Sequence, residues 1–139
     1  MDANFRVLVT GSRDYADRQR VRSELEKLLV YAANGLPSRI TVVHGGATGA
    51  DTLADEEAKK LGYLTEPYPI TKEEWRPPHL HGALDRMAGP RRNAQMIATG
   101  IDLCLAFPQG ESRGTRGCMK LAEAAAILVI NCSEKPLTN

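Results

Sequence analysis

Three short glycine-bearing segments in this chain have the composition of anion-binding turns. They are Thr10–Asp14, His44–Asp51 and Phe107–Thr115. Each follows an apolar run typical of a buried strand and precedes a run with helical spacing. A turn of small residues between a strand and a helix directs free backbone N–H groups at an anion. Three such turns in one small domain favour a single phosphorylated ligand held by several loops.

The segment His44–Asp51 is the strongest of these signals. Gly45 and Gly46 would let the backbone approach a phosphate without an intervening Cβ, and Gly49 would permit close packing at the helix start. The spacing matches neither the dinucleotide pattern G-x-G-x-x-G nor a P-loop. A tight turn without a ligand is the alternative.

The other two turns add side-chain donors to the same predicted site. Gly114 and Thr115 offer backbone N–H groups, a hydroxyl and the positive end of a helix dipole. Ser12 can donate to a phosphate, and Arg13 can pair with one through two hydrogen bonds. A simple threonine cap and a solvated surface arginine are the alternatives.

Arg91 and Arg92 fall in the first turn of a predicted helix, where the helix dipole disfavours cations unless an anion is bound. This conflict favours a ligand-binding role for the segment. The pair His79 and His81 has no third ligand nearby, so we expect no metal site. Trp75 could stack on a base, but beside two prolines we interpret it as a loop anchor.

Strand-like and helix-like segments alternate along the chain, which predicts a parallel sheet with helices on both faces. In such sheets the ligand lies beyond the carboxyl ends of the strands, where the strand order reverses. We expect the first strand to be central and Asp51 to cap a helix. Strands are predicted over residues 6–10, 40–43, 63–68, 103–106 and 127–130, and helices over 17–33, 51–61, 90–99 and 115–125.

Size and charge limit the possible classes of protein. A chain of 139 residues fits one domain, which we place over residues 1–132 with a loose tail over 133–139. A formal net charge of +1 argues against a dedicated nucleic-acid binder. We expect a cytoplasmic location, because we find no signal peptide or membrane span, and the three cysteines form no C-x-x-C pair.

Taken together, the segments resemble the SLOG superfamily of Rossmann-like nucleotide-binding proteins, and within it the YspA-like, YpsA-related branch. The resemblance extends from about Arg6 to Ile130. It implies an α/β fold, a Rossmann-like three-layer sandwich with a mainly parallel central sheet of about five strands. The residues that carry it are Val9-Thr10-Gly11-Ser12-Arg13, Val43 to Asp51, Trp75, Ala88-Gly89-Pro90, Arg92-Asn93, Met96, Cys104 to Pro108 and Gly114-Thr115-Arg116.

The resemblance also implies a pocket for a nucleotide-derived ligand. Related proteins include the lonely guy phosphoribohydrolases and DNA-processing protein A, which binds single-stranded DNA. In the phosphoribohydrolases a glutamate follows the Gly-Thr pair, but here Cys118 takes that position. The binding half of the motif therefore carries over and the catalytic half does not. Asp51 is left as a weak candidate for a catalytic residue.

The leading hypothesis is a protein that binds a nucleotide or a nucleotide-derived phosphorylated small molecule, including NAD or ADP-ribose derivatives, as its sensor or processor. The alternatives are an N-glycosidase or phosphohydrolase acting on that ligand and, more weakly, a single-stranded nucleic-acid module. We expect a homodimer or tetramer and a nucleotide-derived ligand, and the sequence identifies no certain cofactor. The expected ligand-binding residues are Gly11, Ser12, Arg13, His44, Gly45, Gly46, Gly49, Asp51, Arg92, Asn93, Pro108, Gly114 and Thr115.

Overall fold

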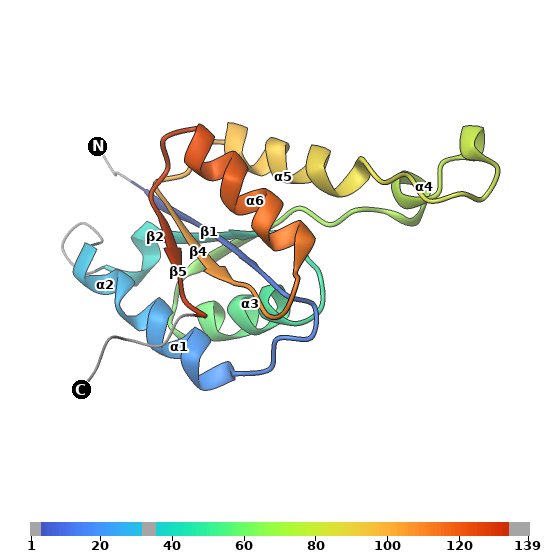
Figure 1. Cartoon of the computed structure of the whole chain (residues 1–139). Helices are drawn as coiled ribbons and strands as arrows, with labels where there is room; N and C mark the ends of the chain where they lie inside the picture. The colour runs from blue at the N-terminus through green and yellow to red at the C-terminus, as the bar shows by residue number, and fades with distance from the viewer. Residues whose placement is uncertain (1–3, 32–35, 134–139) are drawn as a thin grey trace.

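A five-stranded, all-parallel sheet forms the centre of the protein in a computed structural model that describes residues 4–31 and 36–133 (Figure 1). The strand order is β3-β2-β1-β4-β5. Apolar, β-branched runs form the inner strands, as expected for strands covered on both faces. The strands are β1 (Phe5–Gly11), β2 (Ile40–His44), β3 (Leu64–Pro67), β4 (Leu103–Phe107) and β5 (Val129–Asn131).

The order of the strands reverses beside β1. The chain proceeds outward from β1 through β2 to β3, then returns to the other side of β1 with β4. The β1–β4 ladder ends with the pair Gly11 and Phe107. The carboxyl ends of these two strands therefore diverge into loops that leave in different directions, which is the usual place for a ligand.

Helices cover both faces of the sheet (Figure 1). Helices α1 (Arg18–Glu26) and α3 (Ala50–Lys60) lie on one face, where Leu25 and Ala54 pack with alternate residues of β1 and β2. Helices α5 (Ala88–Ala98) and α6 (Arg113–Ala124) lie on the other, through Met96 and Ala122. The predicted three-layer α/β architecture, with its first strand central, is confirmed.

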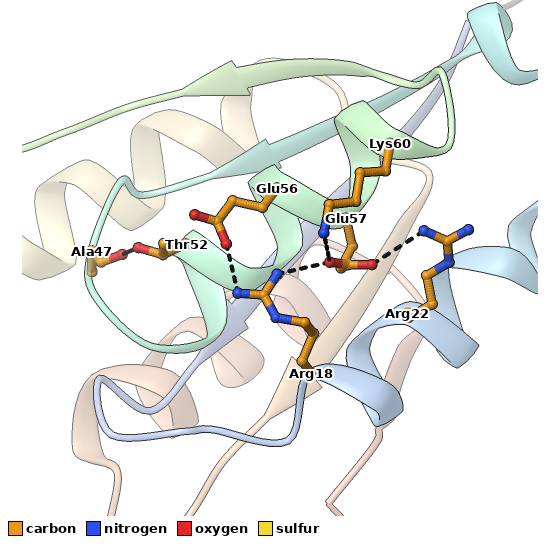
Figure 2. Close-up of polar contacts among 7 residues, drawn as sticks. All are labelled: Arg18, Arg22, Ala47, Thr52, Glu56, Glu57 and Lys60. Carbon is orange, nitrogen blue, oxygen red and sulfur yellow. Dashed lines mark hydrogen bonds and ion pairs between the residues drawn. The ribbon is translucent and has the colours of Figure 1, made fainter.

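A cluster of charges joins α1 to α3 (Figure 2). The buried Glu57 carboxylate accepts hydrogen bonds from Arg18 at 2.7 Å, Lys60 at 3.1 Å and Arg22 at 3.2 Å. The Arg18 guanidinium also pairs with Glu56 at 2.8 Å. The hydrogen bond from Arg18, more than any other contact, lowers the pKa of Glu57 to about 2.

The segment between β3 and α5 projects beyond the sheet (Figure 1). We call residues 69–87 the arm. It contains the short helix α4 (Lys72–Trp75), whose start is closed by a reciprocal capping box between Thr71 and Glu74. It also contains the 3-10 helix η3 (Pro78–Leu80). The sequence indicated an irregular segment here, and the structure adds these two turns.

The predicted strands and the helices predicted over 51–61, 90–99 and 115–125 agree with the observed bounds to within two residues, but two other predictions differ from the structure. The predicted helix 17–33 is divided into α1 and α2 (Leu28–Tyr31), and residues 32–35, where it was predicted to end, lie outside the described residues. The predicted cap of α3 is wrong, because Gly49 holds the N-cap position and Asp51 lies in the first turn. The predicted tail over residues 133–139 is described only at Ser133. A further 3-10 turn, η2 (Pro37–Arg39), precedes β2.

Within residues 4–31 and 36–133, no helix has the length and apolar character needed to cross a membrane.

Candidate functional site

A cavity of about 660 Å³ opens where the strand order reverses, at the carboxyl ends of β1 and β4. We call it the switch-point cavity. Its walls come from the turns after β1 and β2, the loop after β4, helices α3, α5 and α6, and Trp75 of the arm. The lining residues are Thr10, Gly11, Ser12, Arg13, Asp14, Ala47, Asp51, Trp75, Gly89, Pro90, Arg92, Asn93, Gln109, Ser112, Arg113, Gly114, Thr115, Gly117 and Leu121.

The structure brings together most of the residues that the sequence selected. Those that line the switch-point cavity are Gly11, Ser12, Arg13, Asp51, Arg92, Asn93, Gly114 and Thr115. Gly45 and Gly46 instead line a smaller adjoining cavity of about 230 Å³, which shares Arg13 and Arg92 with the first. His44, Gly49 and the buried Pro108 line neither of these cavities.

The turn after β2 does not present its amides to the cavity as the sequence suggested. The N–H groups of Gly45 and Ala47 donate to the Asp51 carboxylate at 3.0 and 3.3 Å. The N–H of Gly46 donates to His44 Nδ1 at 3.0 Å. The Asp51 carboxylate thus accepts the amides that we expected to bind a phosphate. Its hydrogen bonds fix the conformation of the turn.

His44 also holds this turn in place through hydrogen bonds. Because its Nδ1 accepts from Gly46, the neutral ring carries its proton on Nε2, which donates to Asp55 Oδ1 at 2.8 Å. Burial raises the pKa of Asp51, and the hydrogen bonds from the Ala47 and Gly45 amides and the nearby Arg92 act in the opposite direction. His44 therefore positions the turn without lining either cavity, whereas Asp51 holds the turn and also lines the switch-point cavity.

Gly49 holds two of the turns together. Its φ of +77° is readily adopted only by glycine, and an added Cβ would overlap backbone atoms of Ser12 and Arg13. The N–H of Ala50 donates to the Ser12 carbonyl at 3.1 Å beside this contact. The close packing expected at Gly49 is therefore present, and it is packing against the turn after β1.

Ser12 links that turn to the loop after β4. Its hydroxyl accepts from the Gln109 N–H at 2.9 Å and lies 2.8 Å from Ser112 Oγ. Ser112 holds the N-cap position of α6 with a left-handed backbone, φ 43° and ψ 56°. The Ser12 hydroxyl thus already forms hydrogen bonds to protein groups in the wall of the cavity.

Arg92 is partly buried between the two cavities. Its Nη1 donates to the carbonyl oxygens of Gly45 at 2.6 Å and Tyr68 at 3.2 Å, and its Nε donates to Asn93 Oδ1 at 2.9 Å. Burial lowers the pKa of Arg92, but a guanidinium remains charged at neutral pH. Arg91 instead pairs with Asp85, whose negative charge compensates for the unfavourable position of the Arg91 cation at the positive end of α5.

The first turn of α6 leaves donors directed at the switch-point cavity. The first i→i−4 bond of the helix runs from the Arg116 N–H to the Ser112 carbonyl at 3.0 Å, so the N–H groups of residues 113–115 have no partner within the helix. Thr115 Oγ1 and Asn93 Nδ2 have no hydrogen-bond partner among the described residues, although both side chains are more than nine-tenths buried. Neither of these donor atoms is itself buried, since Thr41 Oγ1 is the one buried polar side-chain atom without a partner among the described residues. Both are therefore open to the cavity, where a ligand or water can accept from them.

Two glycines of α6 also line the cavity, although no neighbouring protein atom requires a glycine at either position. A Cβ on Gly114 or Gly117 would meet no protein atom within 4 Å, and neither has a positive φ. Glycine in a helix costs about 1 kcal/mol relative to alanine. Nothing in the described protein requires these residues to be glycine, and the space beside them belongs to the cavity.

Sequence reasoning missed several lining residues. Gln109 and Ser112 lie inside the third predicted turn and were available from that position alone. Gly117 could also have been identified, because a glycine inside a predicted helix is unfavourable unless something requires it there. Trp75 was interpreted as an anchor, but it lines both cavities described above. No group of three or more histidine, cysteine, aspartate or glutamate residues that could hold a metal occurs among residues 4–31 and 36–133.

A parallel α/β sheet with a donor-lined cavity at its switch point defines a Rossmann-like ligand-binding domain. The chain belongs to the YspA, cpYpsA-related SLOG family, whose model matches residues 5–71. It is 46% identical over 137 residues to the Gene 61 protein of Mycobacterium phage D29, across 94% of this chain and 98% of that protein. Membership of the SLOG family implies a nucleotide-related ligand.

Among solved structures, the chain is similar to DNA processing protein A (DprA) from Streptococcus pneumoniae, with a TM-score of 0.47 and 20% sequence identity. The match covers 94% of this chain, which spans 59% of the DprA chain.

Proposed function

We propose that this protein binds a nucleotide-derived phosphorylated small molecule in the switch-point cavity and acts as its sensor or processor. Derivatives of NAD and of ADP-ribose are among the candidates. Family membership supports a nucleotide-related ligand, and the volume of about 660 Å³ is in the range typical of small-molecule sites.

The observation that carries the proposal is the empty space beside Gly114 and Gly117. Two glycines near the start of one helix lower its stability, yet a methyl group at either would touch no described protein atom. Glycines kept where protein packing does not require them fit a surface against which a ligand lies closely.

The donors around that space suit a phosphate. The N–H groups of residues 113–115 and the Thr115 hydroxyl provide hydrogen bonds at the positive end of α6. Arg92 and Arg13 line the same cavity and would balance the negative charge. Asn93 Nδ2 would donate to a phosphate or ribose oxygen.

The test is the substitution Gly117→Ala. It should raise the melting temperature, because an alanine in a helix is favoured over glycine by about 0.5–1 kcal/mol. The same variant should bind ribose 5-phosphate and nucleoside monophosphates about tenfold or more weakly by calorimetry, because the methyl group enters the ligand's space.

A matched control separates this effect from a general change in α6. Lys120→Ala alters the same helix at a position that does not line the cavity, and its affinity for each probe should equal that of the unaltered protein. If Gly117→Ala stabilises the protein and binds every probe with unchanged affinity, the proposal is wrong. Absence of measurable binding in the unaltered protein would also refute it for these probes.

A further inference from the structure

A further groove lies on the arm beside Trp75. Its volume is about 610 Å³, and it is lined by Arg13, Lys72, Glu73, Trp75, Arg76 and Leu84. We call it the arm groove. It shares Arg13 and Trp75 with the switch-point cavity, so the two spaces meet at these side chains.

Trp75 is held firmly at this meeting point. It is the last residue of α4, and its carbonyl accepts from the Asp85 N–H at 2.7 Å, which closes the arm on itself. The Arg13 guanidinium lies over the indole at 5.4 Å from the ring centroid, and an edge of the ring faces Gly89 of α5. The indole therefore lies between the turn after β1 and helix α5, and it forms a wall of both spaces.

The chemistry of the arm groove suits a flat ring next to a phosphate. The indole of Trp75 and the half-exposed Leu84 supply apolar surface. Lys72 and Arg13 add positive charge, and neither forms an ion pair with a carboxylate among residues 4–31 and 36–133. Glu73 offers an acceptor for an exocyclic amine. Aromatic stacking with neighbouring cations is a common mode of binding bases without strict sequence preference.

We infer that the ligand extends across Arg13, with its phosphate in the switch-point cavity and its nucleobase in the arm groove against Trp75. This inference rests on the proposed function and adds the site of the base to it. On this inference, Trp75 contacts the ligand directly. The arm is then the part of the protein that distinguishes a nucleotide from a sugar phosphate.

The chain offers a direct readout, because Trp75 is its one tryptophan. The probes are ribose 5-phosphate, the four common nucleoside monophosphates and ADP-ribose. Binding of at least one base-bearing probe should quench the tryptophan emission and be about tenfold tighter than that of ribose 5-phosphate. Ribose 5-phosphate should bind without comparable quenching.

Two variants test whether the arm groove is responsible. Trp75→Leu should remove the advantage of the base-bearing probe, measured as the ratio of its affinity to that of ribose 5-phosphate. Leu84→Glu places a carboxylate in the groove at a position that is 47% exposed, so it should fold normally and weaken only the base-bearing probe. Leu128→Glu, at a 66% exposed leucine outside the groove, is the matched control and should bind every probe normally.

The outcomes separate the two proposals. If ribose 5-phosphate binds and no base-bearing probe binds more tightly, or if the advantage persists in both Trp75→Leu and Leu84→Glu, the base does not lie in the arm groove and the proposed function stands. If no probe binds to the unaltered protein, the proposed function and this inference both fail.

Discussion

Gly45 and Arg92 are in a contact that leaves no room for a side chain between them. Arg92 Nη1 donates to the Gly45 carbonyl at 2.6 Å, and a Cβ on Gly45 would overlap the guanidinium group. The contact joins the turn after β2 to helix α5. The place of Arg92 in the switch-point cavity therefore depends on the glycine at position 45.

The substitution Gly45→Ala should displace the Arg92 guanidinium. Loss of its hydrogen bonds to the carbonyl groups of Gly45 and Tyr68 should lower the free energy of unfolding by about 1–2 kcal/mol. Affinity for ribose 5-phosphate should fall about tenfold, because the cation moves away from the proposed phosphate position. Thermal denaturation and calorimetry measure the two effects.

A double-mutant cycle provides the control for this prediction. In a protein that already carries Arg92→Ala, the added Gly45→Ala should change neither stability nor affinity appreciably, because the overlapping group is gone. Additive effects of the two substitutions would show that Gly45 acts independently of Arg92.

Thr115 and Thr41 allow a matched pair of substitutions. Both residues are buried, but the Thr41 hydroxyl is a buried atom without a hydrogen-bond partner, whereas Thr115 lines the switch-point cavity and its hydroxyl is open to it. Thr115→Val should weaken binding of ribose 5-phosphate about tenfold, since one hydrogen bond to a charged group is lost. Thr41→Val should leave binding unchanged and stabilise the fold by up to about 1 kcal/mol. Equal affinities in the two variants would exclude a role for the Thr115 hydroxyl.

The layout of the fold was predictable because hydrophobic periodicity marks its elements strongly. The apolar runs that include Val7–Val9 and Leu103–Ala106 form the central strands, and the glycines at 62 and 100 end helices as their position indicated. The division of the first helix and the cap of α3 were missed. The start of α3 depends on the partners of the Asp51 carboxylate, which accepts from the Gly45 and Ala47 amides, and the sequence pattern does not determine those partners.

The candidate site was predictable as a place but not in its internal bonding. Parallel topology brings the turns near Ser12 and Thr115 to one edge of the sheet, so their meeting follows from the strand order. Sequence could not show that the Asp51 carboxylate accepts the amides of the glycine turn. Nor could it show that Trp75, far along the chain, returns to Arg13.

Stability should fall in acid as Glu57 becomes protonated. Its pKa is lowered from 4.5 to about 2 in the folded protein, chiefly by the hydrogen bond from Arg18. A carboxylate with a lowered pKa stabilises the fold above its unfolded pKa, and this contribution is lost as the pH falls from about 4.5 to 2.

The substitution Glu57→Gln should lower the free energy of unfolding by only about 1 kcal/mol at pH 7, because the cations that pair with Glu57 are partly exposed. The difference between the variant and the unaltered protein should narrow toward pH 2, and a constant difference in denaturation experiments would contradict this role.

Self-association is expected through the outer surface of the helices. Leu128, between α6 and β5, is 66% exposed, so an apolar side chain is available there for contact with a second copy. Light scattering at micromolar concentration should give the mass of a dimer or tetramer. Leu128→Glu should reduce that mass if this surface is the interface, and a monomeric unaltered protein would rule the expectation out.

The final prediction concerns Cys118, which stands where related phosphoribohydrolases carry a glutamate. Its side chain is fully buried against Leu8 and Cys104 on the sheet face covered by α5 and α6. Burial raises the pKa of this thiol to about 11, so it is neutral at physiological pH. A neutral thiol neither stabilises developing positive charge at a sugar nor replaces a carboxylate in acid–base chemistry.

We therefore expect no phosphoribohydrolase activity of the cytokinin type, measured as release of free base from a panel of nucleoside monophosphates. Cys118→Glu would test whether the missing carboxylate is the reason, but it buries a charge, so its folding must be checked by circular dichroism. Cys118→Ser preserves the size of the side chain and should leave base release absent. Efficient release by the unaltered protein that survives Cys118→Ser and is lost in Asp51→Asn would contradict the prediction. It would also make Asp51, whose carboxylate lines the cavity while holding the glycine turn, the catalytic group.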